Sequence, residues 1–189
     1  MSADATRAEI VREARKVFVR DGFAAAGLVE IARAANATTG AIYHHFKDKK
    51  GLFRAVAEDV ERELLERVGA IALKESDPWA QLRAGAIASL ELSAEPDIAR
   101  IIFHEAPSVI GSAEWREIER RYAFGLTVQL LEALKASGAS RIRNAELTAS
   151  MLLGALIEAA TTISLAKDKK KALVDARDTM INFVDALKN

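Results

Sequence analysis

Apolar residues recur every three or four positions along nearly the whole chain, and this spacing limits the fold more than any other feature of the sequence. No segment shows the strict alternation, enriched in Val, Ile and Thr, that a half-buried strand requires. Half of the 189 residues are hydrophobic and only three are proline, a composition typical of helical globular proteins. The sequence therefore predicts an all-α fold of about nine helices.

The first helix is marked by capping signals at both ends. Thr6 and Glu9 have the spacing of a capping box, so we expect the helix to begin at Thr6 and to end at Asp21-Gly22. Its buried face is predicted to consist of Ile10, Ala14, Val17 and Phe18.

Two short helices follow, over about 28–35 and 39–45, with a turn at 36–38. Helices this short are unstable alone, so they must pack against their neighbours. A long helix is then expected from Lys49, with an apolar face formed by Leu52, Phe53, Val56, Val60, Leu64, Val68 and Ile71.

Caps, glycines and prolines delimit the remaining helices. Ser76-Asp77-Pro78 separates the long helix from the next one, and Pro96 opens another. A short connector is expected around 106–112. Three further helices are predicted, one from Ser112 that stops at Ser137-Gly138 and two over about 145–166 and 169–187, the first of these two capped by Asn144.

The formal net charge is zero, but the charges are distributed unevenly. Residues 1–57 hold ten Lys/Arg and six Asp/Glu, a net of +4, whereas the remaining 132 residues hold 17 and 21, a net of −4. A neutral chain does not coat nucleic acid by bulk electrostatics, but a local basic excess favours binding to phosphates. The basic part coincides with the short helices.

Several function classes lack the residues they need. The chain has no cysteine and only three histidines, and it contains no glycine-rich phosphate loop, His-x-x-x-His pair or convincing Ser-His-Asp set. We therefore expect no enzyme, metal or cofactor. No secretory leader is recognisable, and no stretch approaches the roughly 18 apolar residues of a membrane span, so the sequence predicts a cytoplasmic protein without a membrane partner.

Distinctive residues are spaced along positions 6–56. Thr6-Arg7 opens the segment, Phe18 and Gly22-Phe23 lie near the end of its first helix, Ile31-Ala32 lies in the second, and residues 36–49 have the sequence NATTGAIYHHFKDK. The run Gly-x-aliphatic-Tyr-x-His-Phe followed by lysines resembles the helix-turn-helix of the tetracycline-repressor (TetR) family of transcription regulators. The resemblance implies a three-helix DNA-binding module followed by a C-terminal domain that dimerises and encloses a small-molecule pocket.

One position departs from the family pattern. TetR-like proteins usually carry Thr or Ser at the cap of the second helix, where the hydroxyl also reaches a phosphate, and this chain has Ala26-Gly27. Because glycine is tolerated as a helix cap, the fold is expected to survive while one phosphate contact is missing.

The helix over 39–45 has the side chains that a recognition helix needs, with small or polar residues for base edges and flanking residues for phosphates. Base contacts are predicted for Thr39, Ala41 and His44, with Gly40 allowing close approach of the backbone. Phosphate contacts are predicted for Tyr43, His45, Lys47 and Lys49, and Thr38 completes the set. Ile42 and Phe46 are expected in the core. The alternatives are a packed Tyr43, solvated histidines and an ordinary charged helix start.

The last two helices have an unusual apolar surface. The helix over 145–166 is apolar almost all round, and the last helix has a heptad-like seam that includes Met180 and Leu187. We predict a four-helix dimer interface built from two helices of each subunit, and packing within the chain's own core is the alternative. The interface residues predicted are Met151, Gly154, Ala155, Met180, Phe183 and Leu187.

Polar or aromatic residues on otherwise apolar helix faces are candidate effector contacts. They are Phe103, His104, Trp115, Tyr122, Phe124, Glu158, Thr161 and Thr162. Glu158 stands between Ile157 and Ala159, and a buried carboxylate requires a partner. A structural salt bridge or an exposed position is the alternative for Glu158, and a hydrogen-bonded core histidine is the alternative for His104.

These features together predict a helix-turn-helix domain over 1–50 and an effector-binding and dimerisation domain over 51–189. The expected function is that of a DNA-binding transcription regulator, a repressor, whose homodimer binds a palindromic double-stranded DNA operator and is released by a small-molecule effector of unknown identity. The alternative is a helical protein-interaction module whose basic face binds an acidic partner.

Overall fold

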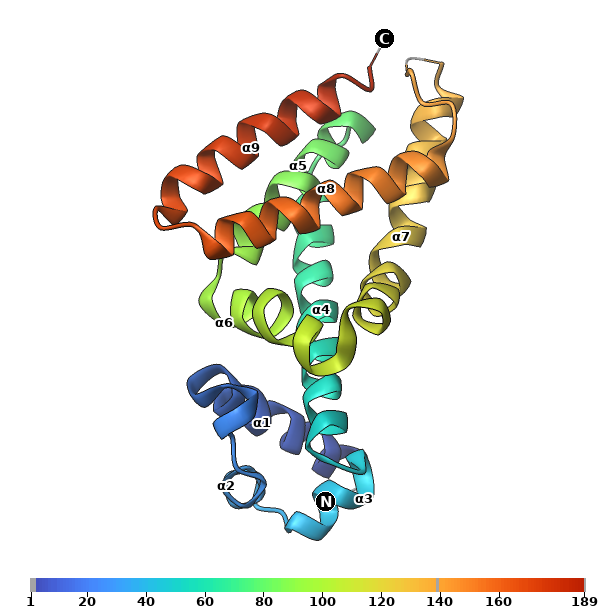
Figure 1. The fold of residues 1–189 in the computed structure, drawn as a ribbon. Helices are drawn as coiled ribbons and strands as arrows, with labels where there is room; N and C mark the ends of the chain where they lie inside the picture. Colours follow the sequence, from blue (N-terminus) through green and yellow to red (C-terminus); the bar gives the residue numbers. More distant parts are fainter. Residues whose placement is uncertain (1–2, 139, 189) are drawn as a thin grey trace. The chain divides into compact units, whose positions relative to one another are not determined.

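The computed structural model describes residues 3–138 and 140–188, and helices account for nearly all of them (Figure 1). Within those residues the one extended pairing is an isolated bridge between Ser140 and Lys188. The all-α prediction is confirmed. The chain divides into two compact units: the first unit is formed by residues 1–60 and 100–115, and the second unit by residues 61–99 and 116–189.

The first unit contains α1 (Ala3–Ala25), α2 (Leu28–Ala34), α3 (Thr39–Phe46) and the beginning of α4 (Lys49–Ala72). The apolar face predicted for the first helix is buried. The capping box was wrong, because α1 begins at Ala3 and Thr6 therefore lies inside the helix. The Glu9 carboxylate instead accepts a hydrogen bond from Arg12, one turn along α1.

Helix α1 continues past the predicted end but bends at Gly22, whose φ of 80° and ψ of 165° are accessible almost only to glycine. The bend places the ring of Phe23 beside two buried rings, with centroids 6.1 Å from Phe18 and 5.4 Å from Phe53. Phe18 and Phe53 themselves meet edge to face at 5.1 Å. This aromatic cluster joins α1 to α4 in the core of the first unit.

Residues 96–111 form a continuous irregular helix. The short α6 (Pro96–Ile98) leads into two π-helical segments, η1 (Ala99–Glu105) and η2 (Pro107–Gly111). The predicted connector at 106–112 is therefore wrong, since the backbone stays helical through Pro107. The π form is uncommon, and it frequently occurs at functional sites.

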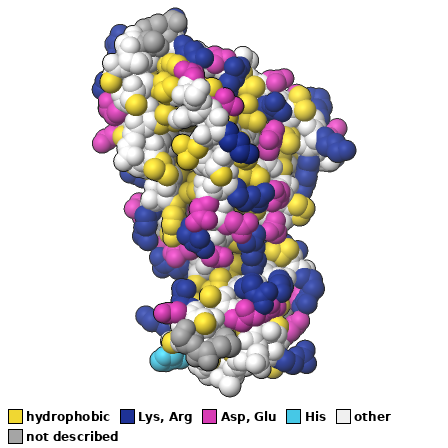
Figure 2. All heavy atoms as spheres, turned by 180° about the vertical axis from the view of Figure 1, so that it is seen from behind, with side chains coloured by type: hydrophobic (Ala, Val, Ile, Leu, Met, Phe, Trp, Pro, Cys, Tyr) yellow, Lys and Arg dark blue, Asp and Glu magenta, His cyan; other side chains and the backbone are white. Residues whose placement is uncertain are grey.

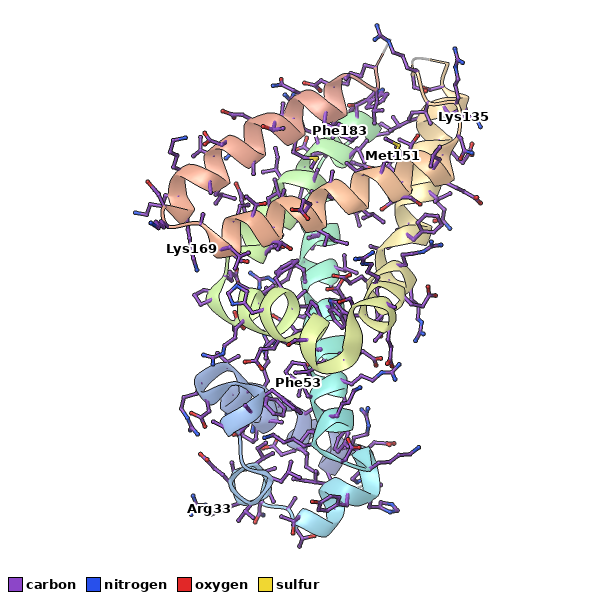
Figure 3. All side chains as sticks on the ribbon, in the orientation of Figure 1. Arg33, Phe53, Lys135, Met151, Lys169 and Phe183 are labelled. Atoms are coloured by element: carbon purple, nitrogen blue, oxygen red, sulfur yellow. The ribbon has the colours of Figure 1, made fainter. Side chains whose placement is uncertain are left out.

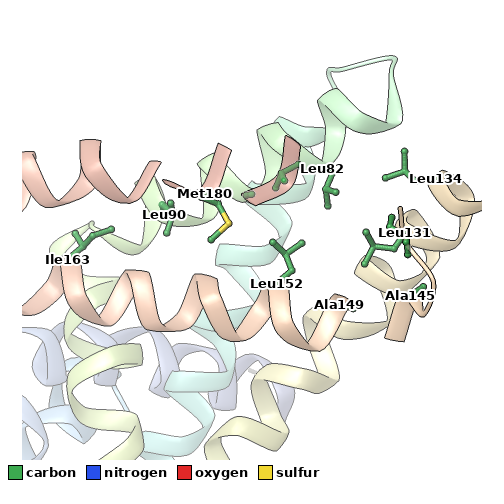
Figure 4. Packing of buried hydrophobic residues seen from close by; sticks show 12 residues of the cluster. Leu82, Leu90, Leu131, Leu134, Ala145, Ala149, Leu152, Ile163 and Met180 are labelled. Atoms are coloured by element: carbon green, nitrogen blue, oxygen red, sulfur yellow. The ribbon is translucent and has the colours of Figure 1, made fainter. Parts of the chain in front are cut away.

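The second unit contains the rest of α4, α5 (Pro78–Ser93), most of α7 (Ser112–Ala136), α8 (Ala145–Leu165) and α9 (Lys169–Asp185). The predicted caps are present: the side chain of Asp77 accepts from Ala80 N at 2.8 Å, and that of Asn144 accepts from Leu147 N at 2.9 Å. The core is filled by apolar residues of α5, α7, α8 and α9, nine of which are labelled in Figure 4: Leu82, Leu90, Leu131, Leu134, Ala145, Ala149, Leu152, Ile163 and Met180.

Helix α8 is more apolar than its burial in a single chain explains. Leu147, Met151 and Leu165 are each more than half exposed. In the described part of the chain, α8 alone is long and apolar enough to cross a membrane by length and composition, a test that helices of protein cores also meet. Part of the apolar surface of α8 is therefore left uncovered within one chain.

Candidate nucleic-acid interface

The recognition-helix candidate α3 is anchored by its apolar residues and open at its N-terminal end. Ile42 and Phe46 are buried, as predicted. Thr38 is the N-cap, and its side-chain oxygen accepts from the N–H of Ala41 at 3.1 Å. Since a Thr cap satisfies one of the N–H groups that a helix leaves unpaired, it fixes where α3 begins.

The predicted DNA contacts fall on the accessible side of α3. Tyr43 is 54% exposed, and it is joined at the surface by Thr38, Gly40, His44 and Lys47. Thr39, Ala41, His45 and Lys49 are half-buried. A helix whose apolar side chains hold it to the core while its small and polar ones stay accessible can enter a major groove. The contacts themselves remain predictions.

The turn after α3 sets the direction of Lys47. Its φ of 69° is positive, and Asp48 N donates to Phe46 O at 2.9 Å, which closes a γ-turn around Lys47. Asp48 then caps α4, because its Oδ1 accepts from Gly51 N at 2.7 Å. The backbone of Lys47 therefore forms a tight corner between α3 and α4, and its side chain is exposed there.

Lys49 has a structural role that the sequence did not indicate. Its Nζ donates to the carbonyl of Ala24 at 3.0 Å and lies 4.9 Å from the centroid of the Phe23 ring. Because these contacts tie α4 to the end of α1, Lys49 has less freedom to reach a phosphate than Lys47. Its predicted phosphate contact remains a prediction.

The N-terminus of α2 matches the departure noted in the sequence. Gly27 is the N-cap, and no side chain caps the helix there. Ala26 is buried and has no hydroxyl, so neither residue offers a side-chain contact to a phosphate.

Glu105, at the end of η1, was missed by the sequence analysis. Its Oε2 accepts the N–H of Phe23 at 2.6 Å, and its Oε1 lies 3.5 Å from Arg100 Nε. A Cβ on Gly22 would stand 2.7 Å from Glu105 Oε1 and 2.8 Å from Arg100 Nη2. The bend at Gly22 thus leaves space for the Glu105 carboxylate and makes the N–H of Phe23 available to it. The resulting hydrogen bond fastens α1 to the π-helical segment within the first unit.

Charge on the surface is mixed in sign. The face in Figure 2 carries Lys/Arg and Asp/Glu side chains side by side over much of its area. Several are paired, such as Arg20 with Glu30 at 2.7 Å and Arg54 with Glu114 at 2.6 Å. DNA binding by this chain would therefore depend on local contacts of the first unit, as the zero net charge predicts.

The effector candidates are divided between the two units. Phe103, His104 and Trp115 belong to the first unit, and Tyr122, Phe124, Glu158, Thr161 and Thr162 to the second. Trp115 is buried with an indole N–H that has no partner among the described residues. Glu158 is exposed in the single chain, which agrees with the alternative given for it in the sequence analysis. His104 is also exposed, so it is not a core histidine. Their contacts with an effector stay predictions.

The buried carboxylates lie elsewhere. Glu61 on α4 is 6% exposed and Glu119 on α7 is 7% exposed, and both belong to the second unit. Glu61 follows Ala57 by four residues and precedes Leu64 by three, so it occupies an apolar-face position of α4. That spacing is the signal that could have revealed it. Across residues 3–138 and 140–188, no group of three or more His, Cys, Asp or Glu is arranged to hold a metal ion.

The predicted dimer residues differ in what they expose. Met151 on α8 and Phe183 on α9 are labelled in Figure 3; Met151 is 58% exposed. Gly154 is also exposed, and Ala155, Phe183 and Leu187 are partly buried against the chain's own core. Met180 is part of that core, so in the single chain it packs within the chain, as the alternative to the dimer interface predicted.

Comparison with known families agrees with this architecture. Residues 10–56 match the family described as bacterial regulatory proteins of the tetR family, and residues 79–187 match the Tetracyclin repressor-like C-terminal domain. The chain therefore belongs to the TetR family of transcription regulators.

Individual relatives support the same assignment. A TetR-family transcriptional regulator of Pectobacterium atrosepticum is 32% identical, with a TM-score of 0.87 over 98% of this chain and 95% of that one. The HTH-type transcriptional regulator AcrR of Shigella flexneri is 32% identical over 142 residues, which span 70% of this chain and 64% of that regulator. RolR in complex with resorcinol shares the fold, with a TM-score of 0.74 at 22% identity over 96% of this chain and 88% of that one.

Proposed function

We propose that the protein is a cytoplasmic transcriptional repressor whose homodimer binds a two-fold symmetric DNA operator and is released by a small-molecule effector. The observation that carries this proposal is α3, which is anchored by Ile42 and Phe46 and presents Thr39, Tyr43 and their neighbours at an accessible helix end. The repressor role is supported by relatives such as the probable acrEF/envCD operon repressor of Escherichia coli, 35% identical over 106 residues that span 53% of this chain and 48% of that protein.

Dimerisation is supported by the exposed apolar residues of α8. Leu147 and Met151 are both 58% exposed on one helix. Gly154, one turn beyond Met151, has no side chain, and a Cβ built there would point into open space, so a second helix can approach closely at this position. Covering such residues with the same surface of a second copy would remove apolar area from water and produce a two-fold symmetric assembly.

Release by an effector follows from the geometry of paired recognition helices. Two helix-turn-helix units meet successive major grooves when they are about 34–36 Å apart. A ligand that binds more tightly to a form with another separation of the recognition helices therefore lowers DNA affinity. The loss is limited by the difference between the ligand's affinities for that form and for the DNA-binding form. That RolR is in complex with resorcinol supports a ligand-binding role for this fold.

The test is a selection of bound duplexes from a random DNA library by the full-length protein at near-physiological salt. We expect enrichment of a two-fold symmetric motif with half-sites about one helical turn apart. A variant with Thr39 and Tyr43 both replaced by alanine should lose that enrichment while retaining its helical circular dichroism. A folded, dimeric wild-type protein that enriches no motif would contradict the proposal.

A further inference from the structure

Two adjacent histidines lie on the helix that carries the predicted DNA contacts. His44 is exposed and His45 is half-buried, and they precede the buried Phe46 at the end of α3. Their rings meet edge to face, with centroids 5.2 Å apart. Neither imidazole forms a hydrogen bond or an ion pair with another described residue. Histidine is the side chain whose charge ordinarily changes between pH 5 and pH 8, so protonation can change the charge of this surface.

The charged groups around α3 are mostly cationic. They are Asp4 and Arg7 in the first turns of α1, Glu30 and Arg33 on α2, Lys47 and Asp48 in the turn after α3, and Lys49 and Lys50 at the start of α4. Arg7 packs against α3, with its guanidinium carbon 5.2 Å from the centroid of the Phe46 ring. Glu30 pairs with Arg20 at 2.7 Å, and Asp48 caps α4. Carboxylates are therefore outnumbered here, and DNA brings anions in the form of phosphates.

We propose that proton uptake by His44 and His45 couples the DNA affinity of this regulator to pH, so that the protein binds DNA more tightly as pH falls. This inference rests on the proposed function and adds a means of regulation to the same site. An imidazolium carries a positive charge and donates from both ring nitrogens, whereas a neutral imidazole has one donor and no charge. Because a nearby phosphate favours the charged form, the complex holds more protons than its separate components. By linkage, such a complex becomes more stable as pH falls.

The short separation of the rings makes the two protonations depend on each other. Two imidazolium charges on rings whose centroids are 5.2 Å apart repel each other. DNA weakens this repulsion, because phosphates place negative charge beside the pair. Proton uptake on DNA binding therefore belongs to His44 and His45 together, and it is assigned most clearly by replacing both.

The first experiment measures the affinity of the full-length wild-type protein for the selected operator between pH 8 and pH 6 at constant ionic strength. A dimer has four of these imidazoles, and a contribution of about twofold from each would give roughly a sixteenfold increase. We expect affinity to rise at least about tenfold toward pH 6 while circular dichroism stays constant. A constant affinity, or one that falls toward pH 6, would overturn the proposal.

Calorimetry on the wild-type protein counts the protons directly. The same duplex is bound near neutral pH in buffers of different ionisation enthalpy, and the dependence of the observed enthalpy on the buffer gives the number of protons exchanged. We expect net uptake of at least about one proton per dimer. No net uptake, or net release, would refute the proposal without reference to any variant.

The variants His44→Gln and His45→Gln, made singly and together, assign the protons to the pair. Glutamine keeps a donor and an acceptor but is neutral throughout this pH range. The measured quantity is the ratio of affinities at pH 6 and pH 8, because both residues are predicted DNA contacts, and this ratio should fall toward one in the double variant. His104→Gln is the matched control: it removes the third histidine of the chain, which is exposed on η1. With no effector present, it should keep the wild-type ratio, and an unchanged ratio in the double variant would refute the assignment.

Salt dependence separates phosphate pairing from a structural role. Each imidazolium that pairs with a phosphate adds to the counterions that DNA releases, so the slope of log affinity against log salt should be steeper at pH 6 than at pH 8, by up to about 0.9 per pair. This difference should disappear in the double variant. A slope that stays the same at both pH values would contradict phosphate pairing by the histidines.

The outcomes distinguish this inference from the proposed function. Binding to a selected operator without proton uptake would refute the histidine pair and leave the proposed function intact. If no operator is selected, the same titrations are made with a random-sequence duplex at low salt, because phosphates carry no sequence information. Proton uptake there, lost in the double variant, would support the histidine pair although the sequence-specific regulator fails. Absence of binding to either duplex would refute both.

Discussion

Replacing Glu105 tests whether its carboxylate holds the end of α1 to the π-helical segment. The acceptor Oε2 lies 2.6 Å from Phe23 N, and the Glu105 side chain is only 17% exposed. A hydrogen bond to a charged group contributes about 1.5–3 kcal/mol. The ion pair with Arg100 adds little, because Arg100 is 39% exposed and the separation is 3.5 Å.

The two substitutions of Glu105 should differ in magnitude. Glutamine retains an acceptor oxygen but loses the charge, which removes roughly half of the bond, about 1 kcal/mol. Alanine leaves the partly buried N–H of Phe23 without its acceptor and should cost about 2 kcal/mol. For a chain of this length these losses correspond to a fall in Tm of about 3 °C and about 6 °C.

Thermal and urea unfolding followed by circular dichroism measure both effects. The matched control is Glu114, also in the first unit, whose pair with Arg54 at 2.6 Å is about half exposed. Glu114→Gln and Glu114→Ala should each change stability by less than about 0.5 kcal/mol. If Glu105→Ala were as stable as Glu114→Ala, the inferred anchoring of α1 would be refuted.

Four further predictions concern other parts of the molecule. Gly22→Ala should lower the free energy of unfolding in urea by about 1–3 kcal/mol, because the φ of Gly22 is 80°. Gly125→Ala, whose Cβ would lie in open space on α7, should not destabilise the protein. Equal losses of stability in the two variants would contradict the strain argument. Met151→Glu should shift the protein from dimer to monomer in light scattering, since it places a charge in the proposed interface, and an unchanged mass would exclude α8 from that interface. Lys47→Gln should weaken operator binding and lower the slope of log affinity against log salt by about one; an unchanged slope would remove Lys47 from the phosphate contacts. Burial raises the pKa of Glu61 from 4.5 to about 8 in the folded protein, so the folded state binds a proton that the unfolded state has lost, and the free energy of unfolding should fall as pH rises between these values. Glu61→Gln should flatten this pH dependence when unfolding is measured at several pH values. An equal slope in Glu61→Gln would show that the pH dependence comes from another group.

The helix-turn-helix is the part that the sequence predicted best. The run that resembles the TetR helix-turn-helix identified Ile42 and Phe46 as core residues of α3, and the cap residues located the start of α5 at Asp77 and of α8 at Asn144. These features are local, since a capping side chain and the N–H that it satisfies are three residues apart. Thr6 and Glu9 show the limit of the method, because the capping-box spacing also occurs inside a helix.

The candidate site could be predicted only in part. Local sequence identified the accessible side of α3, but it could not show that the Lys49 ammonium binds the carbonyl of Ala24, 25 residues earlier in the chain. Glu158 attracted attention because its sequence neighbours are apolar, yet it is exposed in the single chain. Glu61 fell on the apolar face of α4 and was overlooked, since most acidic residues near such a face remain solvated.

The sequence by itself determined that this chain is helical, where most of its helices begin and end, and which side chains anchor α3. All of these depend on interactions within a few residues, namely the helical period, side-chain caps and the backbone limits of glycine and proline. Only the tertiary structure decided that Glu105 meets Phe23, 82 positions away, and that Glu61 and Glu119 are buried where their charges interact. Such pairs depend on how distant helices pack, and a pattern of period 3.6 contains no information about which faces meet.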